Sequence, residues 1–300
     1  MRDGIAIGID AGGTKTLGVL VDAGGREIAR ARGPGANPWS AGRDAARRAL
    51  ATVVEPLLVG SSVRALCLGS GGIGRDGGDA AAEEDVRALL PADVAVAVCI
   101  DAVAALGVIA GARPAMVVIA GTGSLVYGDR GDASPVRLGG YGALIGDPGS
   151  GAALGLAALR HTARALDRDA PRGAMSDAIA ARLGLRRSNE ILEKIGWPAF
   201  DVALVASLAP LVAQAAALGD DAADRIIASE AEDLAADARY VATLVRTDAP
   251  LAALFVGSIF GAFPAIRARV ERALRETGPI VLHEKIEPAL GAARLALAML

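Results

Sequence analysis

Two glycine-rich turns, each placed between apolar segments, most constrain what this chain can fold into. In "IAIGIDAGGTKTLGVLVDAGG", residues 5–25, an alternating apolar segment leads into "GGTK", and a second alternating segment follows. The segment "AMVVIAGTGSLVYGD", residues 115–129, repeats this arrangement. Apolar alternation predicts a strand on each side of each turn. Superposing Gly13 on Gly123 aligns the strands, so we interpret the two segments as an internal duplication with a boundary near "GARPA".

Two familiar nucleotide-binding motifs match parts of the sequence only in spacing. Gly8 and Gly13 have the separation found in a P-loop, yet the residues after the lysine alternate like a strand, whereas a P-loop leads into a helix. The segment "GSGGIG", residues 69–74, approximates a dinucleotide-binding motif with Asp101 as the ribose ligand. The intervening "RDGGD" separates those glycines from the next helix, which disfavours this interpretation.

Both duplicated turns are suited to holding phosphate groups. Glycine lets backbone N–H groups approach an oxyanion closely, and successive N–H groups in a turn form an anion-binding nest. Thr14, Lys15, Thr122 and Ser124 would add side-chain donors. The alternative is a pair of ordinary glycine-rich hairpin turns. Because the two turns occupy equivalent positions in the duplication, we favour phosphate binding.

The length of 300 residues predicts two domains. Short links between the first three strands, expected at 5–9, 16–21 and 27–32, predict an antiparallel meander, and the strand–helix–strand order that follows predicts an α/β sheet that is partly parallel. The apolar run 94–112 has the length of a membrane span, but we interpret it as a buried strand followed by a helix that begins at Asp101. The other elements that we expect are helices at 41–58 and 80–90, strands at 63–68, 94–100, 115–120, 125–129 and 251–256, a mostly helical region at 151–240, and helices at 265–276 and 288–300.

Composition excludes several classes of protein. Thirty-one Lys and Arg residues against 34 Asp and Glu residues give a net charge of −3, and the charges are scattered, which argues against a nucleic-acid-binding surface. Cys67 and Cys99 lie in apolar segments, as buried thiols of a reducing compartment do. The first residues lack the features of a signal peptide and leave no helix-turn-helix before the first strand. We therefore expect a cytoplasmic protein that does not bind DNA.

Two aspartates end predicted strands beside the glycine turns. Asp101 ends a strand and begins a helix, where backbone N–H groups would keep a carboxylate ionised. It is a candidate general base, and a plain helix N-cap is an equally good interpretation of its position. Asp10 precedes the first turn and could hold Mg²⁺ through water, or could simply start the turn.

Six segments of the chain together resemble the BadF/BadG/BcrA/BcrD ATPase family, and within it the N-acetylglucosamine and glucosamine kinases. These segments, in chain order, are "GIDAGGTKT", "ANPW", "CIDAVAAL", "IAGTGS", "LGGYGALIGDPGSG" and "PALGAARLAL". The resemblance implies an actin-like, ribonuclease H-like fold of two related α/β domains, with Mg·ATP held by two phosphate hairpins in the interdomain cleft. We expect an N-terminal domain of residues 1–112, completed by the C-terminal helix at 288–300, and a second domain of residues 113–287 that carries helical insertions.

The resemblance also assigns roles to residues. Asp101 matches the catalytic base of the family. The matching nucleotide-binding residues are Gly12, Gly13, Thr14, Lys15, Gly121, Thr122, Gly123, Ser124, Gly257, Ser258 and Gly291. The expected sugar-binding residues are Asn37, Asp101, Gly140, Tyr141 and Asp147, although Tyr141 stands where the family usually has tryptophan. Asp147 could also lie at the metal side or in the N-cap region of the helix near Gly151. Trp39, two residues after Asn37, could be a core anchor.

The function implied by the resemblance is transfer of the γ-phosphoryl group of ATP to a hydroxyl, expected to be the 6-OH, of a hexosamine such as N-acetylglucosamine or glucosamine. Pro148 replaces a Glu found in many relatives, and Leu125 replaces an Asn of the animal N-acetylglucosamine kinases, so an unmodified hexose stays open as the acceptor. The alternatives are an ATPase activator of a 2-hydroxyacyl-CoA dehydratase or benzoyl-CoA reductase system, and a non-catalytic sugar sensor. We expect ATP and Mg²⁺ as cofactors, a small-molecule sugar as substrate, no nucleic-acid or membrane partner, and a homodimer.

Overall fold

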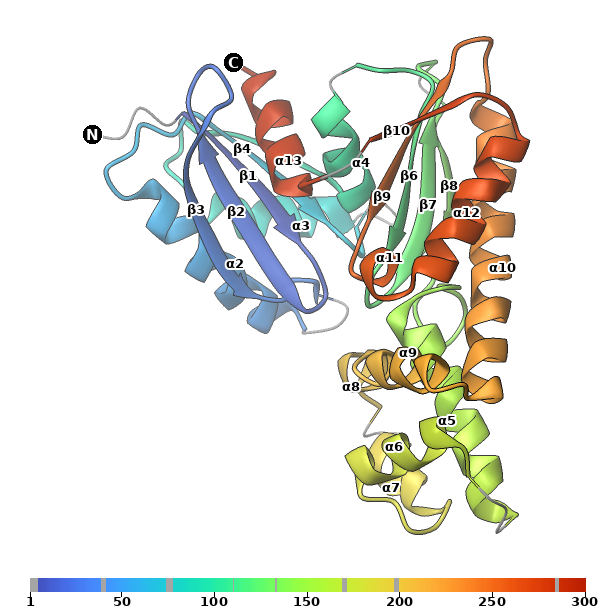
Figure 1. Cartoon of the computed structure of the whole chain (residues 1–300). Helices are drawn as coiled ribbons and strands as arrows, with labels where there is room; N and C mark the ends of the chain where they lie inside the picture. The colour runs from blue at the N-terminus through green and yellow to red at the C-terminus, as the bar shows by residue number, and fades with distance from the viewer. Residues whose placement is uncertain are drawn as a thin grey trace. The chain divides into compact units, whose positions relative to one another are not determined.

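The computed structural model describes residues 5–38, 42–73, 78–109, 111–132, 134–168, 172–196, 200–283 and 286–300. Trp39 and Gly74, which the sequence singled out, lie outside these residues. The chain forms two compact units: unit 1 comprises Met1–Arg113 and His283–Leu300, and unit 2 comprises Pro114–Leu282. Each unit contains one five-stranded sheet flanked by helices (Figure 1).

The sheet of unit 1 begins with the predicted antiparallel meander. Its strand order is β3-β2-β1-β4-β5, in which β2 pairs antiparallel with β1 and β3, while β4 lies parallel to β1 and β5. The strands are β1 (Ala6–Ala11), β2 (Lys15–Val21), β3 (Glu27–Pro34), β4 (Ala65–Ser70) and β5 (Ala95–Ile100).

Alternation along β1 places its side chains in two separate layers. Ile7 and Ile9 join the cluster that includes Leu50 and Val54 of α2, whereas Ala6 joins the cluster formed with the C-terminal helix α13. Burial of each large aliphatic side chain contributes about 1.5–3 kcal/mol, so the alternation fixes which face of the strand each helix covers. The helices of unit 1 are α2 (Arg43–Leu58), α3 (Gly78–Arg87), α4 (Asp101–Leu106) and α13 (Pro288–Leu297), with a 3₁₀ turn at Gly107–Ile109.

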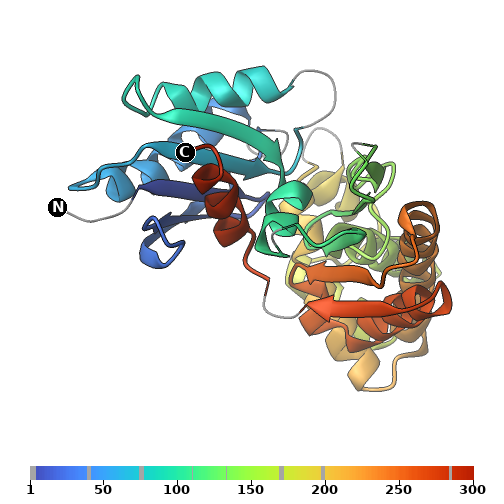
Figure 2. The same cartoon turned by 90° about the horizontal axis from the view of Figure 1, so that it is seen from above.

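Helix α13 returns from the end of the chain to cover the first strands (Figure 2). Its backbone lies directly against β1 and α4, because glycines occur at both contacts. A Cβ atom at Gly8 would overlap the backbone of Ala289 and Ala293, and a Cβ at Gly291 would overlap the carbonyl oxygen of Ala104. The glycines therefore permit a closer approach of backbone to backbone than any other residue would allow.

Unit 2 repeats the arrangement of unit 1. Its strand order, β10-β9-β6-β7-β8, is the order of unit 1 read in the opposite direction, and β6 again pairs antiparallel with the next strand and parallel with the strand on its other side. The repeated topology confirms the internal duplication. The strands are β6 (Ala115–Ala120), β7 (Ser124–Asp129), β8 (Val136–Gly139), β9 (Leu251–Val256) and β10 (Ile280–His283).

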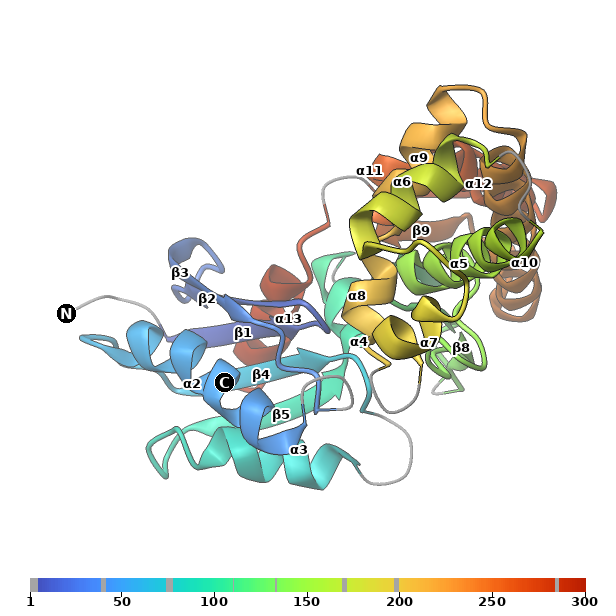
Figure 3. The ribbon, with the colours of Figure 1, turned by 90° about the horizontal axis from the view of Figure 1, so that it is seen from below.

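The helices of unit 2 pack on its sheet and continue beyond it. Among them, α5, α10 and α12 contribute many side chains to the core cluster of the unit. Helices α6 to α9 gather beside α5 and the beginning of α10 rather than on the sheet (Figures 1 and 3). The helices are α5 (Gly151–Asp167), α6 (Ala174–Leu183), α7 (Glu190–Ile195), α8 (Val202–Ala206), α9 (Ala209–Ala217), α10 (Asp221–Val245), α11 (Ile259–Ala262) and α12 (Pro264–Glu276).

Within the described part of the chain, no single helix has the length and apolar character needed to cross a membrane. The helices at Val202–Ala217 and Asp221–Val245, which are bent by 120° relative to each other, reach that length and character only when taken together.

The close packing of α13 can be tested with one added methyl group. Gly291→Ala should lower the free energy of unfolding by about 1–3 kcal/mol, because the new Cβ collides with the carbonyl of Ala104. Gly261→Ala adds the same group to α11, where no heavy atom lies within 4 Å, and should be neutral or stabilise by up to about 1 kcal/mol. Chemical denaturation of both variants measures the difference. Equal effects would contradict the packing described.

Candidate functional site

The first glycine turn joins β1 to β2 and is held by the chain that leaves β3. Inside the turn, the N–H of Gly12 donates to the carbonyl of Lys15 at 3.0 Å. From outside, the N–H of Ala36 donates to the carbonyl of Gly12 at 3.2 Å. A Cβ at Gly35 would overlap the carbonyl of Gly13, so this segment lies flat against the turn. Gly35 and Ala36, after β3, therefore hold the backbone of the turn in place.

The side chains at the tip of this turn reach solvent. Thr14 and Lys15 are both exposed, while the next residue, Thr16, is buried and donates its hydroxyl to the carbonyl of Pro34 at 2.8 Å. The turn thus combines a rigid backbone with an exposed hydroxyl and an exposed ammonium group. These are the groups that a phosphate-binding turn requires.

The second glycine turn joins β6 to β7 and is tied to helix α5. The N–H of Gly121 donates to the carbonyl of Gly123 at 2.9 Å, and the N–H groups of Gly151 and Ala152 donate to the carbonyls of Gly121 and Thr122 at 2.8 and 3.1 Å. Two backbone bonds therefore hold the beginning of α5 against this turn. The duplicated turns are equivalent in topology but are supported by different neighbours.

Ser124 has a structural partner of its own. Its side chain is buried, and its hydroxyl donates to the carbonyl of Pro148 at 2.7 Å. A hydroxyl has one proton to donate, so in this arrangement Ser124 acts as a support for the loop that contains Pro148. A donor role of Ser124 toward phosphate stays a prediction.

The two glycines assigned to adenosine lie in different units. Gly257 follows β9 with φ +115°, and a Cβ there would overlap the carbonyl of Ala120, so Gly257 and the exposed Ser258 lie beside the second turn. Gly291 lies in α13 against α4. The missing side chain of Gly291 is thus explained by helix packing, and its adenosine role stays a prediction.

Three predicted site residues, Asp101, Asn37 and Asp10, lie near the ends of β1, β4 and β5. Asp101 is the first residue of α4, and its Oδ1 accepts the N–H of Ala102 at 2.8 Å, while the N-cap position belongs to Ile100. A Cβ at Gly71 would lie 3.2 Å from Oδ2 of Asp101 and 3.5 Å from Nδ2 of Asn37. The carboxylate and the amide therefore approach the same glycine, which leaves room between them.

Asp10 is the second carboxylate at this end of the sheet. In the sheet it pairs with Gly69 of β4, the strand between β1 and β5. Burial, followed by the negative charge of Asp101, raises the pKa of Asp10 to about 7. The charge of Lys15 opposes this rise and that of Glu287 adds to it. Asp10 and Asp101 thus repel each other in a partly desolvated site.

A bound cation would relieve this repulsion, and the donor set fits Mg²⁺. Among the described residues, no group of three or more His, Cys, Asp or Glu side chains is arranged to hold a metal ion. Mg²⁺ commonly takes only one or two protein carboxylates and completes its shell with water and substrate phosphates. Asp10 beside the first turn, with Asp101 close to it, matches that requirement.

Asp147 is the most constrained of the predicted sugar-binding residues. It is buried and is the one non-glycine residue with positive φ, +63°, in the described part of the chain. Burial raises its pKa, and the N–H groups of Gly142, Ser124, Tyr141 and Gly140 oppose that rise, the first of them at 3.2 Å. A Cβ at Gly123 would lie 2.5 Å from its Oδ2, so the carboxylate lies against the second turn.

Gly140 and Tyr141 border the same loop. Gly140 has φ +70° and donates its N–H to the carbonyl of Ser124 at 3.0 Å, while the Tyr141 side chain is 55% exposed. The structure therefore brings Gly140, Tyr141 and Asp147 together with the second turn in unit 2. It brings Asn37 and Asp101 together with Asp10 in unit 1.

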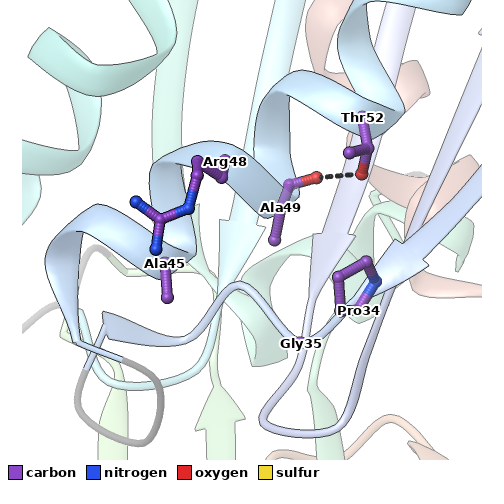
Figure 4. A pocket seen from close by; sticks show the side chains of 6 residues that line it. All are labelled: Pro34, Gly35, Ala45, Arg48, Ala49 and Thr52. Atoms are coloured by element: carbon purple, nitrogen blue, oxygen red, sulfur yellow. Dashed lines mark hydrogen bonds between the residues drawn. The ribbon is translucent and has the colours of Figure 1, made fainter.

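A separate cavity of about 330 Å³ lies between the end of β3 and helix α2 (Figure 4). Apart from Arg48, its lining is uncharged, and none of the predicted site residues takes part in it. One wall is Gly35, whose backbone abuts the first turn. The lining residues are Pro34, Gly35, Ala45, Arg48, Ala49 and Thr52.

Two residues beside the predicted site were not predicted from the sequence to take part in it. Glu230, on α10, accepts the N–H of Gly149 at 2.8 Å, although 81 positions separate the two residues. Nothing in the helical pattern around Glu230 distinguishes it from a solvent-facing acid. Gly71 did belong to a glycine motif, but the motif matched a dinucleotide site and not a space beside a carboxylate.

Comparison with known proteins identifies the family. The model of the BadF/BadG/BcrA/BcrD ATPase family matches residues 7–296. The N-acetyl-D-glucosamine kinase of Dictyostelium discoideum is 31% identical over 253 residues, which are 78% of each chain. The N-acetylmuramic acid/N-acetylglucosamine kinase of Clostridium acetobutylicum is 28% identical over 234 residues, 76% of each chain.

Solved structures show the same architecture. A candidate N-acetylglucosamine kinase from Chromobacterium violaceum superposes with a TM-score of 0.76 at 26% identity, over 98% of this chain and 99% of the other. A ROK family glucokinase from Streptomyces griseus, in complex with glucose and AMPPNP, superposes with a TM-score of 0.57 at 19% identity over 98% and 99% of the two chains, which shows the fold alone. The fold is the duplicated two-domain α/β fold of the actin-like sugar kinases. The chain belongs to the BadF/BadG/BcrA/BcrD ATPase family.

Proposed function

We propose that the protein is an ATP-dependent kinase that transfers the γ-phosphoryl group to the 6-OH of a hexosamine, such as N-acetylglucosamine or glucosamine. The observation that carries the proposal is the pair of carboxylates, Asp10 and Asp101, at the ends of β1 and β5 beside a glycine turn. The names of the relatives from Dictyostelium discoideum and Clostridium acetobutylicum support a sugar of this class.

In this proposal Asp101 acts as the general base. Its Oδ1 accepts the N–H of Ala102, which fixes the carboxylate in place, and the glycine at position 71 leaves space in front of Oδ2. The acceptor hydroxyl attacks the γ-phosphorus, the bond to the bridging oxygen of ADP breaks, and the hydroxyl proton passes to Asp101. Asn37 lies close enough to orient the same sugar.

We assign the phosphate groups of ATP to the two glycine turns. Gly12, Gly13, Thr14 and Lys15 would serve from unit 1, and Gly121 to Ser124 from unit 2. Mg²⁺, held by Asp10 and by water, would supply positive charge that stabilises the transferring phosphoryl group. In unit 2, Asp147, Gly140 and Tyr141 would contact the sugar, while Gly257 and Ser258 would contact the adenosine, as would Gly291 of unit 1.

Within this proposal the two units correspond to the two expected domains, 1–112 with 288–300 and 113–287. We also propose that the kinase acts in the cytoplasm, where ATP is available and where its two free thiols stay reduced. The homodimer stays a prediction.

An ATPase activator with a cluster bridging two subunits is the alternative enzyme class. The sulfur atoms of Cys67 and Cys99 lie 3.8 Å apart on neighbouring strands of the unit 1 sheet. Cys67 is 1% exposed, whereas ligands of a cluster shared between subunits must reach the surface. The burial of this thiol favours the kinase.

The proposal is tested by coupled ADP release with purified protein, Mg·ATP and a panel of glucosamine, N-acetylglucosamine, N-acetylmuramic acid and glucose. Sugar-dependent ADP release, with a sugar phosphate detected by mass spectrometry, supports the kinase. Stoichiometric iron and sulfide in anaerobically purified protein would favour the activator instead. Sugar binding without ADP release would favour the sensor.

Removal of the proposed base gives a direct prediction. Asp101→Asn keeps the size of the side chain and an oxygen that can accept the N–H of Ala102, so folding and ATP binding should survive. The proton acceptor is lost, and general-base catalysis contributes roughly 10²–10⁴-fold in rate. Steady-state kinetics should show kcat reduced by that factor with little change in the KM for ATP. A folded variant with near-normal turnover would assign Asp101 to helix structure only.

The raised pKa of Asp10 predicts that this carboxylate destabilises the ligand-free protein at high pH. Because its pKa in the folded protein, about 7, lies above the ordinary 3.8, the folded state takes up a proton between these values, and stability falls as pH rises across this window. The difference corresponds to at most about 4 kcal/mol at pH 8. Asp10→Asn should therefore raise the free energy of unfolding of the ligand-free protein at pH 8, with no gain below about pH 4.

The same Asp10→Asn variant should lose activity, because it removes a carboxylate proposed to hold Mg²⁺. We expect ADP release to fall by about 10² or more, since metal charge stabilisation contributes several kcal/mol. Chemical denaturation at pH 4, 6 and 8 measures the first effect and coupled kinetics the second. Identical pH profiles of stability for the two proteins would contradict the account of Asp10.

A further inference from the structure

Helix α10 reaches the loop that carries Asp147 through one charged side chain. Oε2 of Glu230 accepts the N–H of Gly149 at 2.8 Å. Burial raises the pKa of Glu230, and the bond from Gly149 opposes that rise. Glu230 is half-buried, so its carboxylate is partly withdrawn from water in order to make this bond. A carboxylate at such a position requires a partner, and the loop provides it.

The loop lies directly on α10 at this point. Gly149 has φ +70°, and a Cβ there would lie 2.7 Å from Cδ2 of Leu234 and 3.3 Å from the carbonyl of Glu230. The backbone of the loop is therefore pressed onto one turn of the helix. Its N–H points to the helix, where the carboxylate of Glu230 is its acceptor.

The peptide between Pro148 and Gly149 is held on both sides. Its carbonyl accepts the hydroxyl of Ser124, at 2.7 Å, from the second glycine turn. Its N–H donates to Glu230 from the helix. This peptide lies one residue beyond Asp147, which has a left-handed backbone and is buried. Because only Pro148 separates Asp147 from this peptide, holding the peptide restricts the backbone path at Asp147.

We propose that Glu230 is a positioning residue, which anchors the peptide between Pro148 and Gly149 and thereby sets the Asp147 carboxylate against the second glycine turn. The consequence for catalysis rests on the proposed function, in which Asp147 contacts the sugar. The anchoring itself does not rest on it. Without Glu230, the N–H of Gly149 would face a packed helix without its acceptor.

Three variants separate anchoring from general stability. Glu230→Ala removes the acceptor, and Glu230→Gln restores an acceptor oxygen of nearly the same reach. Asp237→Ala is the matched control, because Asp237 is a partly buried acid two turns further along α10. Hydrogen-exchange mass spectrometry on peptides covering residues 139–151 reports the loop, and coupled kinetics report the KM values for sugar and ATP and kcat. Thermal unfolding confirms that each variant is folded.

We expect Glu230→Ala to accelerate exchange in this segment by about tenfold or more, since an unmet donor to a charged acceptor costs about that factor. The KM for sugar should rise by about tenfold, with the KM for ATP within about threefold of the parent. Glu230→Gln should bring both the exchange rate and the KM for sugar most of the way back to the parent values. Asp237→Ala should change neither.

Unchanged exchange in Glu230→Ala would overturn the anchoring. Faster exchange with an unchanged sugar KM, in an enzyme whose sugar KM does respond to Asp147→Ala, would overturn the positioning role. If Glu230→Gln brings neither the exchange rate nor the KM for sugar back toward the parent value, the role of the acceptor oxygen is overturned. If the parent protein phosphorylates none of the sugars, the proposed function fails, and the exchange experiment alone decides whether Glu230 anchors the loop.

Discussion

Burial of Asp10 next to the negative charge of Asp101 is the constraint on which the proposed site depends. Folding places the two carboxylates near the ends of β1 and β5, on either side of β4, and leaves Asp10 partly buried. A fold does not need such a pair for stability, because a buried like-charged pair opposes folding. In the proposed function, a bound Mg²⁺ would offset this repulsion and would bring the phosphates of ATP to the site.

The glycines around this site have two distinct functions. Beside Asp101, at Gly71, a missing side chain leaves space next to the Asp101 carboxylate and the Asn37 amide, which in the proposed function is room for the sugar. At Gly8 and Gly291 a missing side chain lets α13 contact β1 and α4 directly. The second group stabilises the sheet that carries the first. A glycine in a family motif therefore does not by itself identify a ligand contact, and Gly291 illustrates this.

Much of the fold could be predicted because the sequence repeats its own pattern. The alternation around Gly13 and Gly123 predicted two equivalent hairpins, and the sheets confirm the duplication. Strands β8 and β10 were missed, since four residues are too few to show alternation and their stability comes from pairing at the sheet edges. The convergence of Asn37 and Asp101 on Gly71 was likewise invisible, because it depends on the parallel register of β4 and β5. Glu230 depends on a contact across 81 positions, for which sequence holds no local signal.

Direct titration of Asp10 is the measurement that tests the carboxylate pair most closely. Carbon-detected NMR of the Asp10 carboxyl in ligand-free protein should give a pKa of about 7. In Asp101→Asn the pKa should move toward the ordinary value of 3.8, because the charge of Asp101 is one cause of the rise. Addition of Mg·ATP should lower it as well. A pKa near 3.8 in the parent, unaffected by Asp101→Asn, would contradict the account.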